Sequence, residues 1–275
     1  MRRIFFCTMY MLPALAGAGE WVEIPAGDFL MGGTAGQIEQ GYRISREGYG
    51  HDGVRKAGWF DNEAPQKSIH LPAFRIQKTP VTQAEYAEFV RATDHPAPFV
   101  DEKTWKSYQL VHPYSRVKQY LWHQGRPPSG RENHPVVLVS FEDAGVYAGW
   151  LSKKTGRTLK LPSEAEWEKA MRGTDGRLYP WGDAYDPKRL NNADQGPFTT
   201  TPVGSFPAGA SPYGVLDGSG NVFEWTRTDW SAGRKAVKGG SWDDHGGVCR
   251  PAAHHGRPAT LKHILIGFRL VEEIE

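Results

Sequence analysis

The sequence predicts a single α+β domain that is rich in ordered loops. The 275-residue chain contains 32 Gly and 20 Pro, yet 39% of its residues are hydrophobic and 12% are aromatic. This apolar content is too high for a disordered chain, so the many Gly and Pro indicate a folded domain with numerous turns. Three short segments carry helix-capping signals and lie among scattered strand-like runs, which is typical of an α+β fold.

The first 18 residues have the features of a secretory signal peptide. Arg2 and Arg3 form a charged start, an apolar run follows over residues 4–15, and small residues then offer a cleavage site. The run is too short to span a bilayer, and no other stretch of the chain is long enough. The sequence therefore predicts export to the periplasm and a mature domain over residues 19–275.

Strand candidates lie at both ends of the mature chain and in its middle. Residues 21–31 alternate around a Pro-Ala-Gly turn, which predicts a β-hairpin. Residues 32–65 are polar and Gly-rich, so we expect a long loop. We expect further strands at residues 68–76, 134–140 and 264–271.

Three helices are predicted from their N-terminal caps. Each follows Thr82, Ser140 or Ser163, and each has its capping-box acid three residues later. Gly156 is a suitable stop for the second helix. The three acids are Glu85, Asp143 and Glu166.

Two long segments, at about 41–65 and 94–133, read as insertions. The second is too aromatic to be a linker, so we expect a lobe that folds onto the main body. Its rings either anchor a protein partner, because Trp and Tyr are favoured at interfaces, or belong to the core. The candidate contact residues are Trp105, Tyr108, Tyr114 and Trp122.

Residues 201–242 show almost no helical or strand period, and the segment GNVFEW within them is the sharpest feature. Its amide, carboxylate and backbone carbonyls are hard oxygen donors, which suit Ca²⁺. The alternative is a tight turn packed by two aromatic rings. The sequence leaves both interpretations open.

The mature chain has one cysteine. Cys7 lies in the predicted signal peptide, which leaves Cys249 without an internal disulfide partner. A lone thiol in an exported protein is reactive, metal-binding or simply buried.

The chain resembles the formylglycine-generating enzyme, or sulfatase-modifying factor, family over residues 21–271. Seven motifs occur in the family's order, namely HPVVLVSFEDAGVYAGWLSKKTGRTLKLPSEAEWEKAMRG, YPWGD, TPVGSFP, PYGVLDGSGNVFEW, VKGGSW, VCRPAAHH and IGFRL. The resemblance implies the family's loop-rich fold, which is related to C-type lectins.

The resemblance argues against formylglycine generation. Members with that activity use two cysteines, which bind copper, after the GGS motif. Cys249 occupies the second position, but Asp244 stands at the first. A carboxylate is a hard ligand and does not replace a thiolate on Cu(I), so copper is not expected. Iron is not expected either, because the ligand motif of the family's iron enzymes is absent.

The resemblance also implies one or two calcium sites. In the first, Gly220 would shape the turn in which the ligands are Asn221, Val222 and Glu224. The ligands of the second would be Asn192 and Ala193, with further oxygens from Asp194, Gly196 or Phe198.

Three functions are consistent with the sequence. The favoured one is a periplasmic, calcium-stabilised binding or regulatory protein with a protein partner, like the TagR-like regulators of type VI secretion. The alternative is a periplasmic oxidoreductase like the PvdO-type proteins of pyoverdine maturation, using Cys249 or a metal. Formylglycine generation is the third. The net charge of +2, with both signs interspersed, gives no indication of a nucleic-acid partner.

Overall fold

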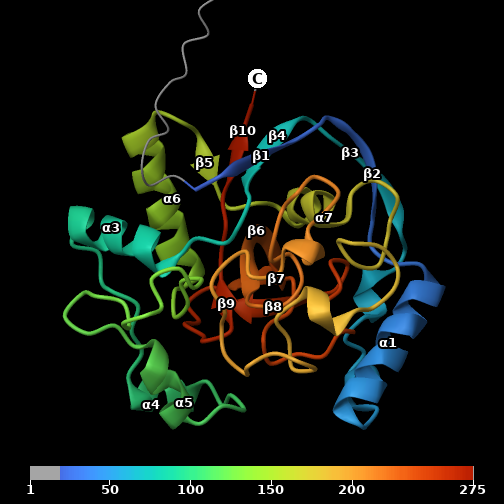
Figure 1. Cartoon of the computed structure of the whole chain (residues 1–275), viewed down its shortest axis with the longest axis horizontal. Coiled ribbons are helices and arrows are strands. Elements are labelled where there is room, and N and C mark those ends of the chain that lie inside the picture. Colours follow the sequence, from blue (N-terminus) through green and yellow to red (C-terminus); the bar gives the residue numbers. More distant parts are fainter. Residues whose placement is uncertain (1–18, 275) are drawn as a thin grey trace, which may run out of the picture.

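The structure is a computed structural model, and it describes residues 19–274 (Figure 1). The predicted signal peptide, residues 1–18, lies outside the described residues. Three sheets and seven α-helices account for the regular structure of the described part, and long ordered loops connect them. No helix in residues 19–274 is long and apolar enough to cross a membrane.

The strands form three separate sheets. The first has the order β1-β4-β10-β5, the second pairs β2 with β3, and the third has the order β8-β7-β6-β9 at the centre of the molecule (Figure 1). The strand bounds are β1 Trp21–Ile24, β2 Gly27–Met31, β3 Lys67–Leu71, β4 Phe74–Gln77, β5 Leu159–Lys160, β6 Phe223–Ser231, β7 Arg234–Lys238, β8 His254–Pro258, β9 Ile266–Gly267 and β10 Val271–Glu273.

The helices lie around these sheets. In Figure 1, α1 lies on one side of the molecule, while α4 and α5 lie at the other end. The helix bounds are α1 Ala35–Tyr49, α2 Gly53–Lys56, α3 Gln83–Thr93, α4 Glu102–Ser107, α5 Tyr114–Val117, α6 Phe141–Thr155 and α7 Glu164–Arg172. Four 3-10 turns complete the set, at Asp61–Glu63, Lys118–Tyr120, Pro187–Arg189 and Pro207–Gly209.

The three capped helices are confirmed. Thr82, Ser140 and Ser163 each cap a helix and form a complete capping box with the acid three residues later. Gly156 ends α6 in the left-handed conformation. These signals were sufficient because a cap satisfies backbone N–H groups of its own helix and needs no distant partner.

Several strand predictions were wrong. Residues 21–31 are not a hairpin, because β1 pairs with β4 and β2 pairs with β3. Residues 68–76 fall in two strands of different sheets, and residues 134–140 contain no strand. The closing segment 264–271 is likewise divided between β9 and β10. Strand pairing depends on partners far along the chain, which local alternation does not specify.

Two irregular segments turned out to contain regular structure. The predicted loop 32–65 contains the 15-residue helix α1, whose Thr34 and Gln37 form a capping box. The stretch 201–242 contains β6 and β7, and the first four residues of β6 are fully buried. The longer insertion, 94–133, contains α4 and α5 and is packed as part of the core.

Buried ion pairs join segments that are far apart in the chain. Glu224 and Arg269 are both 0% exposed, and so are Glu63 and Arg250. Each pair shares two hydrogen bonds between guanidinium and carboxylate. A buried charge without its partner would be strongly unfavourable, so each pair fixes the relative position of two distant segments.

Candidate functional site

A cavity of about 520 Å³ opens beside Asp244, in the loop that follows the GGS motif. We call it the Asp244 cavity. More than half of its lining residues are aromatic or aliphatic, and the charged residues Asp243, Asp244 and Arg257 also line it. It is lined by Tyr49, His51, Gly53, Val54, Trp59, Leu110, Val111, His112, Phe223, Asp243, Asp244, Arg257, His263, Leu265 and Ile266.

The two segments predicted as insertions form much of the cavity wall. The end of α1 and the turns around α2 supply Tyr49 and Trp59, from the segment 41–65. The loop between α4 and α5 supplies Leu110 and His112, from the segment 94–133. These segments therefore shape the site as well as the surface.

A carboxylate–imidazole pair fixes the longer insertion to the loop that carries Asp244. His112 Nε2 lies 2.9 Å from Asp243 Oδ2, and the His112 side chain is 11% exposed. The His112 ring also lies against the Trp242 ring, with 5.4 Å between the centroids. Asp243 is thus already paired with a residue of the protein.

Asp244 forms no ion pair with another residue of 19–274, although the charge of Arg257, which lines the same cavity, acts on it from a longer distance. The Ser241 amide and hydroxyl donate hydrogen bonds to Oδ2, at 3.0 and 2.5 Å, and the Tyr49 hydroxyl lies 3.4 Å from Oδ1. Burial raises the pKa of Asp244 from 3.8 to about 6, although the bonds from Ser241 oppose this shift. The carboxyl therefore exchanges its proton close to neutral pH.

Cys249 is inaccessible. It is 0% exposed and does not line the cavity, and its Sγ lies 4.0 Å from the backbone oxygens of Ser241 and Asp244. A Cβ at Gly240 would lie 2.7 Å from Sγ, so only glycine fits above the thiol. Burial and the nearby Asp244 carboxylate raise the pKa of Cys249 well above its usual value. At neutral pH this residue is a buried thiol.

Two buried histidines near the cavity are neutral. Burial lowers the pKa of both His255 and His263 from 6.5 to about 3. The Leu265 amide donates to His263 Nδ1 at 3.0 Å, and the imidazole stacks on Trp105. Among residues 19–274, no group of three or more His, Cys, Asp or Glu side chains converges as metal ligands.

The residues predicted as the first calcium site do not fit a cation at Glu224. Arg269 donates to both carboxylate oxygens at 2.7 Å, and Trp167 Nε1 donates to Oε2 at 2.8 Å. The Asn221 side-chain oxygen accepts from the Thr201 amide at 3.2 Å. Gly220 and Val222 instead lead into β6, which contains Trp225. Glu224 forms a buried ion pair with Arg269.

The residues predicted for the second calcium site also have other partners. Asp194 Oδ1 lies 2.5 Å from His245 Nδ1, and its Oδ2 accepts from Tyr185, Asn192 and the Gly246 amide. The amide of Ala193 donates to the Asp244 carbonyl, and the Phe198 side chain is 48% exposed.

The adjacent residue Asn191 has the property that a calcium ligand needs. Its Oδ1 is buried and has no hydrogen-bond partner. A Cβ at Gly196 would lie 2.4 Å from this oxygen and 2.4 Å from the Asn192 carbonyl, so the two oxygens converge above a glycine. Unpartnered buried oxygens are rare and call for a ligand, and a hard cation suits them. Asn191 directly precedes the predicted ligand Asn192 and was not itself among the predicted ligands.

Two of the candidate contact residues are core residues. Trp105 is 2% exposed and Trp122 is 6% exposed, and each indole N–H donates to a protein oxygen. Tyr108 and Tyr114 are half-buried and pack against the same clusters. For Trp105 and Trp122, burial supports the core alternative over the interface alternative.

Sequence reasoning did not predict that Tyr49, His112, Asp243 and Arg257 would line the Asp244 cavity. They come from segments that are far apart in the chain. A neighbouring Asp-Asp pair after GGS was visible at positions 243 and 244, but nothing local indicated that His112 would pair with one of them.

The comparisons with known proteins agree with this fold. Residues 13–274 match the family model of the sulfatase-modifying factor enzyme 1-like domain. The chain is 33% identical to the formylglycine-generating enzyme of Streptomyces coelicolor, over 82% of this chain and 73% of that protein. It is also 33% identical to the inactive C-alpha-formylglycine-generating enzyme 2 of Mus musculus, over 81% and 74%. The chain belongs to the sulfatase-modifying factor family.

A solved relative has the same architecture over nearly the whole chain. The structure of PvdO from Pseudomonas aeruginosa matches with a TM-score of 0.72 and 25% identity, and it covers 94% of this chain and 96% of that one. The expected family fold is therefore confirmed. The solved relative, PvdO, is not named as a sulfatase-modifying enzyme.

Proposed function

We propose that this protein binds a ligand in the Asp244 cavity and does not generate formylglycine. The observation that carries the proposal is the carboxyl of Asp244, which faces the cavity where the family's oxidases have a cysteine. A buried carboxyl that forms no direct ion pair with the described residues is well suited to bind a donor group of a ligand.

The chemistry of the loop after GGS disfavours the oxidase reaction. That reaction uses two thiolates, whereas this loop offers the Asp244 carboxyl and the Cys249 thiol, which is fully buried beneath Gly240. A hard carboxylate and a protonated thiol are poor ligands for a soft metal ion.

The lining defines the class of ligand. Trp59, Phe223 and Leu265 offer apolar contact area, and Asp244 offers a hydrogen-bond acceptor. An aromatic or aliphatic body that carries an ammonium or another donor group matches this combination.

The proposal is tested with tryptamine as the probe, by isothermal titration calorimetry at pH 7.5. We expect saturable binding that weakens about tenfold or more in Asp244→Asn, because a charge-assisted hydrogen bond is lost. Asp229→Asn is the control, since Asp229 is an exposed carboxylate paired with Lys235. Unchanged binding in Asp244→Asn would contradict the proposal. So would conversion of a cysteine-containing sulfatase peptide to formylglycine, followed by mass spectrometry in the presence of copper.

A second candidate is an acid–base reaction on the bound ligand, in a PvdO-type enzyme. Two observations favour it: the pKa of Asp244 is raised to about 6, and the overall fold is similar to that of PvdO. In this role Asp244 accepts a proton from the ligand and returns it later. Groups with a pKa near the working pH are the most effective in such transfers. A rate that depends on a group with a pKa near 6, and disappears in Asp244→Asn, would distinguish catalysis from binding.

The binding role is consistent with a periplasmic regulator, including a regulator of type VI secretion with a protein partner. The exposed apolar side chains of the longer insertion support a partner surface, since Phe99 is 52% exposed and Val111 is 95% exposed. Location is tested by cell fractionation and by N-terminal sequencing of the mature protein. Recovery in the cytoplasm with residues 1–18 attached would contradict export.

We also propose one calcium site, centred on Asn191. The Asn191 side-chain oxygen and the Asn192 carbonyl would be among its ligands. Support comes from the unpartnered, buried Asn191 Oδ1. Calcium there would offset the free-energy cost of burying that oxygen, and it would fix the loop before the TPVGSF motif.

A further inference from the structure

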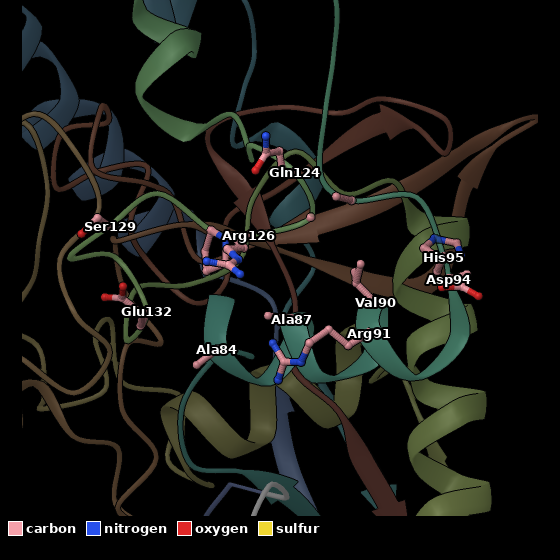
Figure 2. A pocket seen from close by; sticks show the side chains of 13 residues that line it. Ala84, Ala87, Val90, Arg91, Asp94, His95, Gln124, Arg126, Ser129 and Glu132 are labelled. Carbon is pink, nitrogen blue, oxygen red and sulfur yellow. The ribbon is translucent and has the colours of Figure 1, made fainter.

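A second and larger cavity, of about 950 Å³, lies between α3 and the loop over residues 123–132 (Figure 2). We call it the Arg91–Arg126 cavity. The loop is closed by two backbone hydrogen bonds between His123 and Arg126, around a turn with positive φ at Gln124 and Gly125. The cavity is lined by Ala84, Ala87, Val90, Arg91, Asp94, His95, Ala97, Gln124, Gly125, Arg126, Pro127, Ser129 and Glu132.

Arg91 and Arg126 differ from the other arginines in residues 19–274. Neither side chain has a hydrogen bond, an ion pair or a ring contact with another described residue. Every other arginine there has at least one of these. The two arginines without partners line the same cavity, although one comes from a helix and the other from a distant loop.

Two guanidinium groups on one cavity form a receptor for an oxyanion. Figure 2 shows Arg91 reaching from α3 towards the side of the cavity that carries Arg126. Guanidinium groups hold a carboxylate or a phosphate through paired N–H donors. Their charge is available here because no carboxylate in the described part of the chain forms an ion pair with either one.

The rest of the lining distinguishes between these anions. Asp94 and Glu132 line the same cavity, and neither takes part in an ion pair with a described residue. Two carboxylates at the edges repel a multiply charged phosphate more than a monocarboxylate. The α3 side of the cavity carries Ala84, Ala87 and Val90, so it accepts an apolar chain.

We propose that the Arg91–Arg126 cavity binds an organic monocarboxylate with a short apolar chain. The carboxylate lies between the two guanidinium groups, and the chain lies along Ala84, Ala87 and Val90. This site is separate from the Asp244 cavity, with which it shares no lining residue. It does not depend on the function proposed for Asp244.

Hexanoate is the probe, and isothermal titration calorimetry with the mature protein is the measurement. We expect saturable binding that each of Arg91→Gln and Arg126→Gln weakens by about tenfold or more, because each removes a charge-assisted contact. Arg43→Gln is the matched control. Arg43 is an exposed arginine on α1 with a weak 3.9 Å pair to Glu47, and it does not line the cavity. Its variant is expected to bind hexanoate like the unmodified protein.

Inorganic phosphate provides the second arm of the experiment. Phosphate that binds more tightly than hexanoate would overturn the assignment to a carboxylate. Absence of saturable hexanoate binding, or equal binding by both cavity variants and the control, would overturn the site itself. Circular dichroism of each variant checks that the fold is intact, which is expected because both arginines are exposed.

Discussion

At the scale of single residues, burial decides what each candidate group does. Cys249 is a thiol without solvent contact, Glu224 is one half of an ion pair, and Asp244 is a carboxyl at the wall of a cavity. All three are prominent in the sequence motifs, and only Asp244 is placed to meet a ligand. The same residue types have different chemistry because their environments differ.

Asp244 makes a pH-dependent contribution to stability. Burial raises its pKa from 3.8 to about 6, so between these values the folded protein holds a proton that the unfolded chain has released. Stability contributed by this group is therefore full below pH 4 and is lost as the pH rises through 6. We expect the free energy of unfolding of Asp244→Asn, relative to that of the unmodified protein, to increase from pH 4 to pH 7 by on the order of 2–3 kcal/mol.

Urea unfolding at the two pH values measures this gain. Asp229→Asn is the control, because Asp229 is 81% exposed and paired with Lys235, and its difference from the unmodified protein is expected to change little. If the difference in the free energy of unfolding between Asp244→Asn and the unmodified protein is the same at pH 4 and pH 7, the pKa of the Asp244 carboxyl is not raised.

The Glu224–Arg269 pair gives a second prediction at this scale. Arg269→Met leaves a fully buried carboxylate without its cation, so we expect a loss of about 3–5 kcal/mol in the free energy of unfolding. The double variant Glu224→Gln/Arg269→Met removes the buried charge, and its loss is expected to be smaller. Chemical denaturation checks both. A double variant that is no more stable than Arg269→Met would show that the pair is not the cause.

At the scale of elements, the longer insertion is part of the core. Trp105 stacks on His263 at 5.2 Å, and its N–H donates to the His112 carbonyl, so α4 supports the loop that forms one wall of the Asp244 cavity. The insertion therefore couples packing to the shape of the candidate site.

This packing predicts a large effect for Trp105→Ala. We expect a loss of about 3–5 kcal/mol, as for other buried large-to-small changes, together with weaker ligand binding in the cavity. Val111→Ser is the comparison for stability alone, because Val111 also lines the cavity. It is 95% exposed, so its loss is expected to stay within about 0.5 kcal/mol. Thermal unfolding separates the two. Equal small effects would return Trp105 to the surface role predicted from the sequence.

At the scale of the whole molecule, short strands and long loops are held by buried polar contacts more than by extended ladders. β5 and β9 have two residues each, and the strands of residues 19–274 form three sheets instead of one. Such a fold must order many loop residues, which costs conformational entropy. A bound cation that holds a loop would offset part of this cost.

The calcium proposal has a global consequence. With calcium in about 100-fold excess over its dissociation constant, we expect the melting temperature to rise by roughly 5–10 °C over that in EDTA. The shift should vanish in Asn191→Ala and persist in Glu224→Gln, which lowers the melting temperature in both buffers. Differential scanning calorimetry measures it. Loss of the shift in Glu224→Gln, with retention in Asn191→Ala, would restore the site first predicted from the sequence.

The elements that were predicted correctly depend on contacts within a few residues, and the strands that were predicted wrongly depend on distant partners. The caps at Thr82, Ser140 and Ser163 were predicted because a capping box is complete within four residues. The same signal was present at Thr34 and Gln37 and was overlooked in a Gly-rich stretch. The strands were misassigned because β1 and β2, only two residues apart, pair with different partners.

The sequence by itself determined the family, the three capped helices and the presence of Asp244 and Cys249 in the segment after the GGS motif. These depend on residue identity and on short-range order. Only the tertiary structure decided that Cys249 is sealed, that Glu224 belongs to Arg269, and that His112 and Tyr49 meet Asp243 and Asp244 at one cavity. The physical reason is that burial and pairing are properties of segments brought together from distant positions, and they set which groups remain free to bind.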